Sequence, residues 1–170
     1  MDDHDREGDI HKLHDMIRDI KIAMMTTRRD DGHLVSRAMA TQEKHAPGAD
    51  LWFMTTAETH KLDELEREPH VNLAYYKDRT REWISVSGLA RVTRDRDLIK
   101  QLWASDWKAW LPEEGDPRHG TPDDPRIVLI GVDVHSAVYF EARSQPVVLF
   151  EMAKGWMTGK QPDVGTMRRV

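Results

Sequence analysis

One basic residue lies inside a run that otherwise has the pattern of a β-strand. Between His33 and Gln42 the residues alternate, so that Val35, Arg37 and Met39 share a face. An arginine among apolar residues in a strand needs an anionic partner, and its planar fork suits a phosphate or a carboxylate. A structural ion pair or an exposed edge position would produce the same pattern, so the sequence leaves both interpretations open.

A second basic residue lies at the predicted start of a helix. The run Phe53, Met54, Thr55 and Thr56 ends a strand and leads into Thr59-His60-Lys61. Thr59 is suited to cap the helix, and helix N-terminal amides favour anions. A cation in the first turn opposes the helix dipole unless an anion binds there. The alternative is that Lys61 points into solvent.

Three tryptophans recur at helical spacing. Trp103, Trp107 and Trp110 are related as i, i+4 and i+7, within a helical segment over 95–110 that we expect to break near Ser105. Such a stripe is typical of a core or an oligomer interface. It could also shield one side of a planar ligand.

Composition excludes several classes of function. The chain has 170 residues, a net charge of −5 and no cysteine, which argues against broad nucleic-acid or membrane binding, disulfides and thiolate metal sites. We find no phosphate-binding glycine loop, dinucleotide fingerprint or nucleophile elbow, and we expect no metal site. The acidic N-terminus is not a signal peptide, so we expect a soluble, cytoplasmic protein.

The remaining pattern predicts a mainly β fold with inserted helices. We expect one domain over 1–170, built as a split antiparallel β-barrel, with a short N-terminal helix at about 9–17 and a C-terminal helix and mobile polar tail at about 146–170. Asp31-Gly32 predicts a hairpin, and Gly88 within a strand predicts a bulge or bend. The apolar run 51–54 is expected in the centre of the sheet. Two separate strands are expected at 127–134 and 137–141.

Several of these segments, in this order, resemble one family. The set resembles the general stress protein 26-like branch of the pyridoxamine 5'-phosphate oxidase-related flavoproteins, over roughly residues 15 to 165. The segments that carry the resemblance are Ser36-Arg37-Ala38-Met39, Leu51-Trp52-Phe53-Met54-Thr55-Thr56, His60-Lys61, Val86-Ser87-Gly88-Leu89-Ala90-Arg91-Val92, Leu102-Trp103, Lys108-Ala109-Trp110-Leu111-Pro112 and Thr158-Gly159-Lys160-Gln161-Pro162-Asp163.

The resemblance implies an FMN-binding split barrel that forms a homodimer, with the flavin at the subunit interface. Arg37 and Lys61 would then meet the phosphate or ribityl chain, with His60 adjacent. The flavin ring and ribityl chain would be bordered by the remaining matched positions: Ala38, Met39, Phe53, Met54, Thr55, Thr56, Trp103 and Trp110. The two tryptophans would approach from the helical region of the same or the partner subunit.

The resemblance leaves the activity open. The Arg-x-Val-Leu-Leu-Lys stretch of true pyridoxamine phosphate oxidases is absent, which argues against that reaction. An FMN-dependent oxidoreductase acting on a small-molecule substrate is one interpretation, and a non-enzymatic flavin carrier, buffer or sensor is another. A related barrel that binds a deazaflavin or a tetrapyrrole-like ligand is a third.

Overall fold

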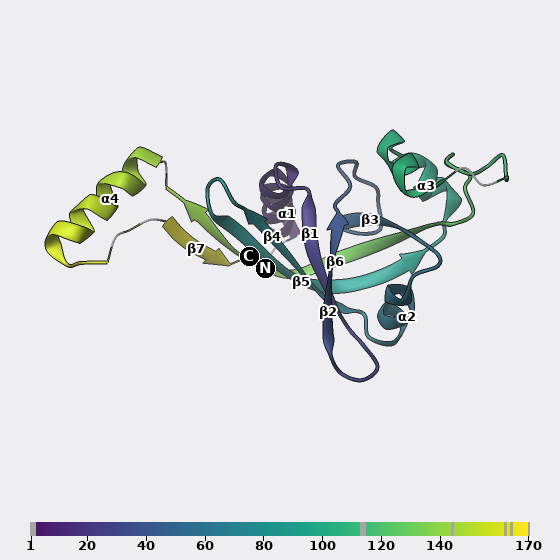
Figure 1. The fold of residues 1–170 in the computed structure, drawn as a ribbon, viewed down its shortest axis with the longest axis horizontal. Helices are drawn as coiled ribbons and strands as arrows, with labels where there is room; N and C mark the ends of the chain where they lie inside the picture. Colours follow the sequence, from purple (N-terminus) through teal and green to yellow (C-terminus); the bar gives the residue numbers. More distant parts are fainter. Residues whose placement is uncertain (1–2, 113–114, 144, 162, 164, 170) are drawn as a thin grey trace.

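A computed structural model of the chain describes residues 3–112, 115–143, 145–161, 163 and 165–169. Antiparallel strands dominate this part of the chain, and helices are inserted between them (Figure 1). The elements are α1 (Asp3–Arg18), β1 (Ile22–Arg28), β2 (Leu34–Ala40), β3 (Leu51–Thr56), α2 (His60–Arg67), β4 (His70–Lys77), β5 (Glu82–Thr93), α3 (Arg96–Leu102), the 3-10 helix η1 (Ser105–Trp110), β6 (Ile127–Ala142), α4 (Gln145–Thr158) and β7 (Gly165–Arg169).

The strands form one sheet that curls toward closure. Its order is β2-β1-β4-β5-β6-β3, with β7 paired to β6. The two ends of this order meet where Thr41 bridges Phe53 and where the Gln42 amide donates to the Trp52 carbonyl over 2.8 Å. The predicted class, a mainly β fold built as a split antiparallel barrel with inserted helices, is therefore confirmed.

The turn and bulge predictions are confirmed. The β1–β2 hairpin turns at Gly32, whose φ of 85° lies in the left-handed region that glycine adopts freely. The β5–β6 register shifts between Ser87 and Gly88, because His135 is an extra residue on β6. A Cβ on Gly88 would lie 2.5 Å from the Asp133 carbonyl oxygen, so only glycine fits this close strand approach.

Strand β3 does not lie in the centre of the sheet, as the sequence suggested, but at one end of the strand order. Its residues are nonetheless buried on both faces because two core clusters flank it. Phe53 packs inside the barrel with Leu73 and Val86, whereas Trp52 packs on the opposite face with Ile99 and Trp107 under α3 and η1. Strand β3 is therefore buried on both faces because a core lies on each side of it, and not because it is central in the sheet.

The C-terminal half differs from expectation in two places. Strand β6 runs unbroken from Ile127 to Ala142, because the polar step that suggested two strands is the bulge at His135. The tail expected to be mobile contains β7, which pairs with the end of β6 from Ala142↔Gly165 to Val138↔Arg169. The N-terminal helix also begins earlier than position 9, at Asp3.

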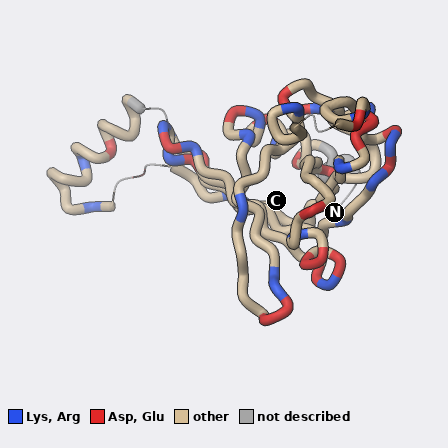
Figure 2. The backbone as a smooth tube through the Cα atoms, turned by 45° about the vertical axis from the view of Figure 1, so that its right-hand side comes forward, with Lys and Arg blue, Asp and Glu red and all other residues tan. Residues whose placement is uncertain are grey.

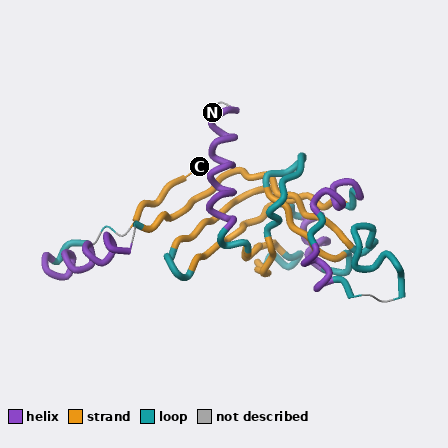
Figure 3. Tube along the Cα trace, turned by 90° about the horizontal axis from the view of Figure 1, so that it is seen from above, coloured by secondary structure: helices purple, strands orange, loops and turns teal. Residues whose placement is uncertain are grey.

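The helices occupy different sides of the molecule. Leu13 and Ile17 of α1 are buried in the barrel core, and α2 contributes Leu62 and Leu65 to the same cluster. Helix α4 stands beyond the end of the sheet, away from the barrel (Figures 1 and 3). No helix in the described part of the chain is long and apolar enough to cross a membrane.

Candidate functional site

Lys61 lies in the first turn of α2 and is half-buried. Its Nζ donates a hydrogen bond of 2.6 Å to Thr55 Oγ1 at the end of β3. Burial lowers the pKa of the Lys61 ammonium, the positive charge of Arg37 lowers it further, and Glu64 partly opposes the shift. No ion pair joins Lys61 to a carboxylate within the described residues, so this position would be stabilised by an incoming anion.

The start of α2 is also free of a side-chain cap. Thr59 occupies the N-cap position, as expected, but makes no side-chain capping bond; its hydroxyl instead donates to the Thr56 carbonyl oxygen over 3.2 Å. The helix then ends at Arg67, two residues before Pro69. The first turn of α2 therefore combines amides that no side chain caps with the ammonium of Lys61, both of which favour an anion, and with the carboxylate of Asp63, which does not.

Arg37 already has an anionic partner inside the chain. Its Nη2 lies 2.8 Å from Glu64 Oε2 on α2, and its Nη1 donates to Thr27 Oγ1 over 2.7 Å. The Thr27 hydroxyl in turn donates to Glu64 Oε2 over 2.6 Å. The structural ion pair that the sequence left open is therefore present, although 27% of the Arg37 side chain stays accessible.

A pocket of about 370 Å³ opens beside this network, between the β1–β2 hairpin and α2. The exposed His60 lines it together with Arg37 and Glu64. The other charged lining residues are Arg29, Asp30, Asp63 and Arg67. The positive charges of its three arginines balance the negative charges of its three carboxylates. Arg67 pairs with Asp30 over 2.8 Å. The adjacent Lys61 therefore supplies the net positive charge of this region.

The strands separate some of the residues that the resemblance grouped together. Met39 is 7% exposed and Phe53 is 0% exposed, because both side chains point into the barrel core. Ala38 points to the opposite, outer face of β2 and is exposed. Thr55 is buried beside Lys61. Met39 and Phe53 could therefore border a ligand only through backbone groups.

A second group lies on the other side of β3. Met54 and Trp103 pack against the cluster under α3 and η1, whereas Thr56 is partly exposed. The chain leaves the helical path between α3 and η1, so the three tryptophans do not form one stripe. Trp107 is buried and donates to Gln42 Oε1 over 2.8 Å, but Trp110 is 74% exposed.

Sequence reasoning missed Glu64 and Thr27, which complete the Arg37 network. A usable signal exists for Glu64, since it follows Lys61 by three residues and stands between the buried Leu62 and Leu65. A carboxylate on the buried face of a helix requires a cationic partner. The sequence contains no comparable signal for Thr27, whose contact with Glu64 joins residues far apart in the chain.

The described part of the chain is a split barrel with a cationic first helical turn beside β3. A family model described as "Pyridoxamine 5'-phosphate oxidase like" matches residues 8–163, and a fungal protein is 36% identical over 95% of this chain. The chain is a member of the pyridoxamine 5'-phosphate oxidase-like family.

Comparison with individual relatives shows which members of this family the chain resembles. Protein bli-3 of Neurospora crassa is the 36% identical relative, and 78% of its length is covered. A general stress protein 26 structure from Jannaschia sp. CCS1 has a TM-score of 0.70 at 23% identity, covering 94% of this chain and 96% of that one. The general stress FMN/FAD binding protein of Xanthomonas citri has a TM-score of 0.59 at 23% identity, covering 74% and 83%. The structural relatives are thus of the general stress protein 26 type.

Proposed function

We propose that this protein binds FMN, with the flavin phosphate at the start of α2. The observation that carries the proposal is the half-buried ammonium of Lys61, which lies in a helix first turn beside a second cation, Arg37. This arrangement costs free energy until an anion arrives. A phosphate monoester carries nearly two negative charges at neutral pH, which suits the position.

The choice of FMN over FAD rests on two observations. The sequence has no dinucleotide-binding fingerprint, and the pocket beside α2 offers a balanced set of charges apart from Lys61. One phosphate group, with nearly two negative charges, already neutralises that single excess charge and leaves none for a second phosphate. The name of the Xanthomonas citri relative, which mentions FMN and FAD, supports a flavin without choosing between the two.

Each candidate residue has a definite role in this proposal. Lys61 and Arg37 hold the phosphate, and His60 lines the pocket together with Arg37. Backbone groups of Met39 and of β3 border the ribityl chain and the ring. Trp103 and Trp110 lie on the other side of β3 and therefore act at the site of a partner subunit. The bound flavin supplies the redox chemistry, and the protein positions it.

The proposal includes a homodimer, which rests on the outer face of the sheet. Registered neighbours on β2, β1, β4 and β5 present a surface with basic side chains at its rim, where Arg28 is opposite Leu34 and His70 is opposite Leu89. We call the surface inside this rim the uncharged face. Its residues are Leu34, Ser36, Ala38, Ala40, Ile22, Met24, Thr26, Asn72, Ala74, Tyr76, Trp83, Ser85 and Ser87. A sheet face that meets water is ordinarily rich in polar and charged residues, so this one is suited to cover a second copy.

We propose that the protein uses the bound flavin to catalyse a redox reaction on a small-molecule substrate. We also propose that the protein is cytoplasmic. A flavin carrier or sensor is the alternative. Steady turnover with a reduced nicotinamide donor, above the rate of free FMN, would support the enzyme. A rate equal to that of free FMN would favour the carrier.

The cofactor proposal is tested by releasing the ligand. The purified protein is denatured by heat and the supernatant is separated by chromatography, with apo protein reconstituted in parallel with FMN, FAD and riboflavin. We expect a yellow protein that releases FMN. Release of FAD alone, or no flavin retained after reconstitution, would refute the proposal. Light scattering on the flavin-loaded protein tests the dimer, and a monomer at micromolar concentration would contradict it.

A further inference from the structure

Helix α4 is an apolar arm whose large apolar side chains are left exposed by the described part of its own chain. The large side chains Leu149, Phe150, Trp156 and Met157 are exposed, Trp156 by 92%, and Val147 and Met152 are exposed as well. Five of these six residues, all but Val147, lie within one broad face of about 160° of the helix, and Glu151, Lys154 and Thr158 lie on the opposite side. Figure 2 shows only isolated charges along α4, and Glu151 and Lys154 are its charged residues.

The pattern identifies the kind of surface that covers α4. A helix lying on a membrane surface has a polar face rich in lysine and arginine, whereas Lys154 is the one basic residue of α4. Its 14 residues span about 21 Å, less than the hydrocarbon core of a bilayer. Protein is therefore the covering surface that fits α4.

The base of the arm is fixed to the sheet, which holds α4 away from its own barrel. Ala142 of β6 pairs with Gly165 of β7 on the two sides of the helix. A Cβ on Gly165 would lie 2.2 Å from the Phe140 ring, so β7 packs closely on β6. Glu141 forms ion pairs with Lys12 of α1 and Arg168 of β7, at 3.4 and 3.5 Å. In Figure 3 the arm extends past the barrel.

The arm base also continues the uncharged face. In the strand register Trp83 is opposite Phe140, Phe140 is opposite Met167, and Ser85 is opposite Val138. These side chains therefore extend the uncharged face from β5 across β6 and β7 to the foot of α4, with Arg169, opposite Val138, as a charged residue at its edge. In a dimer formed through the uncharged face, the α4 arm of each subunit would therefore lie next to the other subunit.

We propose that α4 packs against the barrel of a second copy, so that the two subunits exchange their arms; this inference rests on the homodimer of the proposed function. Exchange buries the apolar residues of both helices without any further component. It also explains why a chain with 32% charged residues carries a 14-residue helix with two of them, Glu151 and Lys154.

The first test is photocrosslinking within the full-length, flavin-loaded protein. Phe150 is replaced by p-benzoylphenylalanine, and unlabelled and 15N-labelled chains are mixed, exchanged and irradiated. We expect crosslinked peptides of mixed isotope composition that join residue 150 to residues 1–142 of the other copy. A dimer whose crosslinks all stay within one chain would overturn the arm exchange alone, whereas a monomeric protein would overturn the dimer as well.

The second test measures dimer dissociation by analytical ultracentrifugation. Phe150→Glu places a charge in the buried contact, so we expect the dissociation constant to rise about tenfold or more. The matched control, Gln101→Glu, adds the same charge at an exposed position of α3 and should leave it unchanged. Equal dissociation constants for Phe150→Glu and wild type would overturn the inference. Binding of wild type to phosphatidylcholine vesicles that Phe150→Glu abolishes, without crosslinks between copies, would assign the arm to lipid instead.

Discussion

Arg37 and Glu64 form an ion pair of 2.8 Å between β2 and α2, next to the ammonium of Lys61. Glu64 therefore holds the guanidinium in place and at the same time neutralises a charge that a phosphate would use. The pair both stabilises the fold and competes with the proposed ligand. These two effects can be separated experimentally.

We predict opposite effects of Glu64→Gln on stability and on FMN binding. The amide keeps the shape of the side chain but loses the charge-assisted bonds to Arg37 and Thr27, so the free energy of unfolding should fall by about 1–3 kcal/mol. Affinity for FMN should rise, because Arg37 is released toward the phosphate. Urea denaturation of the apo protein and a flavin-fluorescence titration measure the two quantities. A large loss of FMN affinity would show that Glu64 is needed to orient Arg37.

The sequence predicted the local parts of this region better than the contacts between them. Asp31-Gly32 and Gly88 were interpreted correctly because a turn and a bulge depend on the backbone freedom of glycine, which is a local property. Arg37 was recognised as needing an anion, but its partner Glu64 lies on an element that reaches it only through the barrel fold. Pattern alone could not choose between a carboxylate and a phosphate.

The errors at the C-terminus have the same origin. Strand β7 is short and polar, and its residues Gly165 to Arg169 carry no strand pattern; only the pairing with β6 makes it a strand. The break expected in β6 is a single extra residue, His135, that the long partner strand accommodates. Both features are set by tertiary pairing, which can override local preference.

Asp124 anchors the loop that precedes β6, and its ionisation should control stability in acid. Its buried carboxylate pairs with Arg126 over 2.8 Å and accepts the Gly120 amide over 2.9 Å. The hydrogen bonds from Arg126 lower the pKa of Asp124 to about 2, below its ordinary value of 3.8. The group therefore contributes about 2 kcal/mol above pH 4, and this contribution is lost as pH falls toward 2.

We predict that Asp124→Asn destabilises the protein at pH 7 and flattens its acid unfolding. Chemical denaturation at pH 7 and at pH 2–4 measures both changes. The stability difference between variant and wild type should shrink as pH falls. A constant difference across this range would mean that Asp124 acts through its shape and not through its charge.

Two glycine substitutions should change stability in opposite directions. Gly88→Ala forces a Cβ to within 2.5 Å of the Asp133 carbonyl oxygen, which should cost about 1–3 kcal/mol. Gly8→Ala lies in α1 with no atom near the added Cβ, so it should add about 0.5–1 kcal/mol through helix propensity. Thermal unfolding of both variants provides the comparison. A Gly88→Ala variant as stable as wild type would show that the bulge is not constrained by this contact.

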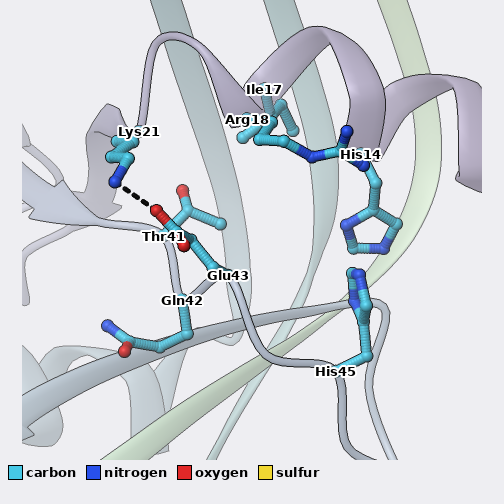
Figure 4. A pocket seen from close by; sticks show the side chains of 8 residues that line it. All are labelled: His14, Ile17, Arg18, Lys21, Thr41, Gln42, Glu43 and His45. Carbon is cyan, nitrogen blue, oxygen red and sulfur yellow. Dashed lines mark ion pairs between the residues drawn. The ribbon is translucent and has the colours of Figure 1, made fainter. Parts of the chain in front are cut away.

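The His14–His45 pair should make stability depend on pH near neutrality. The two rings, from α1 and from the loop before β3, meet edge to face at 4.2 Å in a small pocket (Figure 4). Burial lowers the pKa of His14 below 6.5, and His45 lowers it further, whereas Asp50 opposes the shift. The unfolded chain then binds the proton more tightly, so this contribution is present above pH 6.5 and lost as pH falls below it.

His14→Gln removes this ionisation. Between pH 8 and pH 5.5, wild type should therefore lose more unfolding free energy than the variant does, as measured by urea denaturation at each pH. The histidines that do not contact His14 are common to both proteins and cancel in the comparison. Identical pH profiles would show that the proton on His14 does not destabilise the fold.

Binding of FMN and of riboflavin to wild type and to Lys61→Ala tests the central claim most directly. The two flavins differ in the phosphate, and a charge-assisted contact to an ion is worth about 1.5–3 kcal/mol. We predict that Lys61→Ala weakens FMN binding by about ten- to one-hundred-fold and leaves riboflavin binding almost unchanged in a flavin-fluorescence titration. Equal affinities of both proteins for FMN, or no flavin binding by wild type, would contradict a phosphate site at the start of α2.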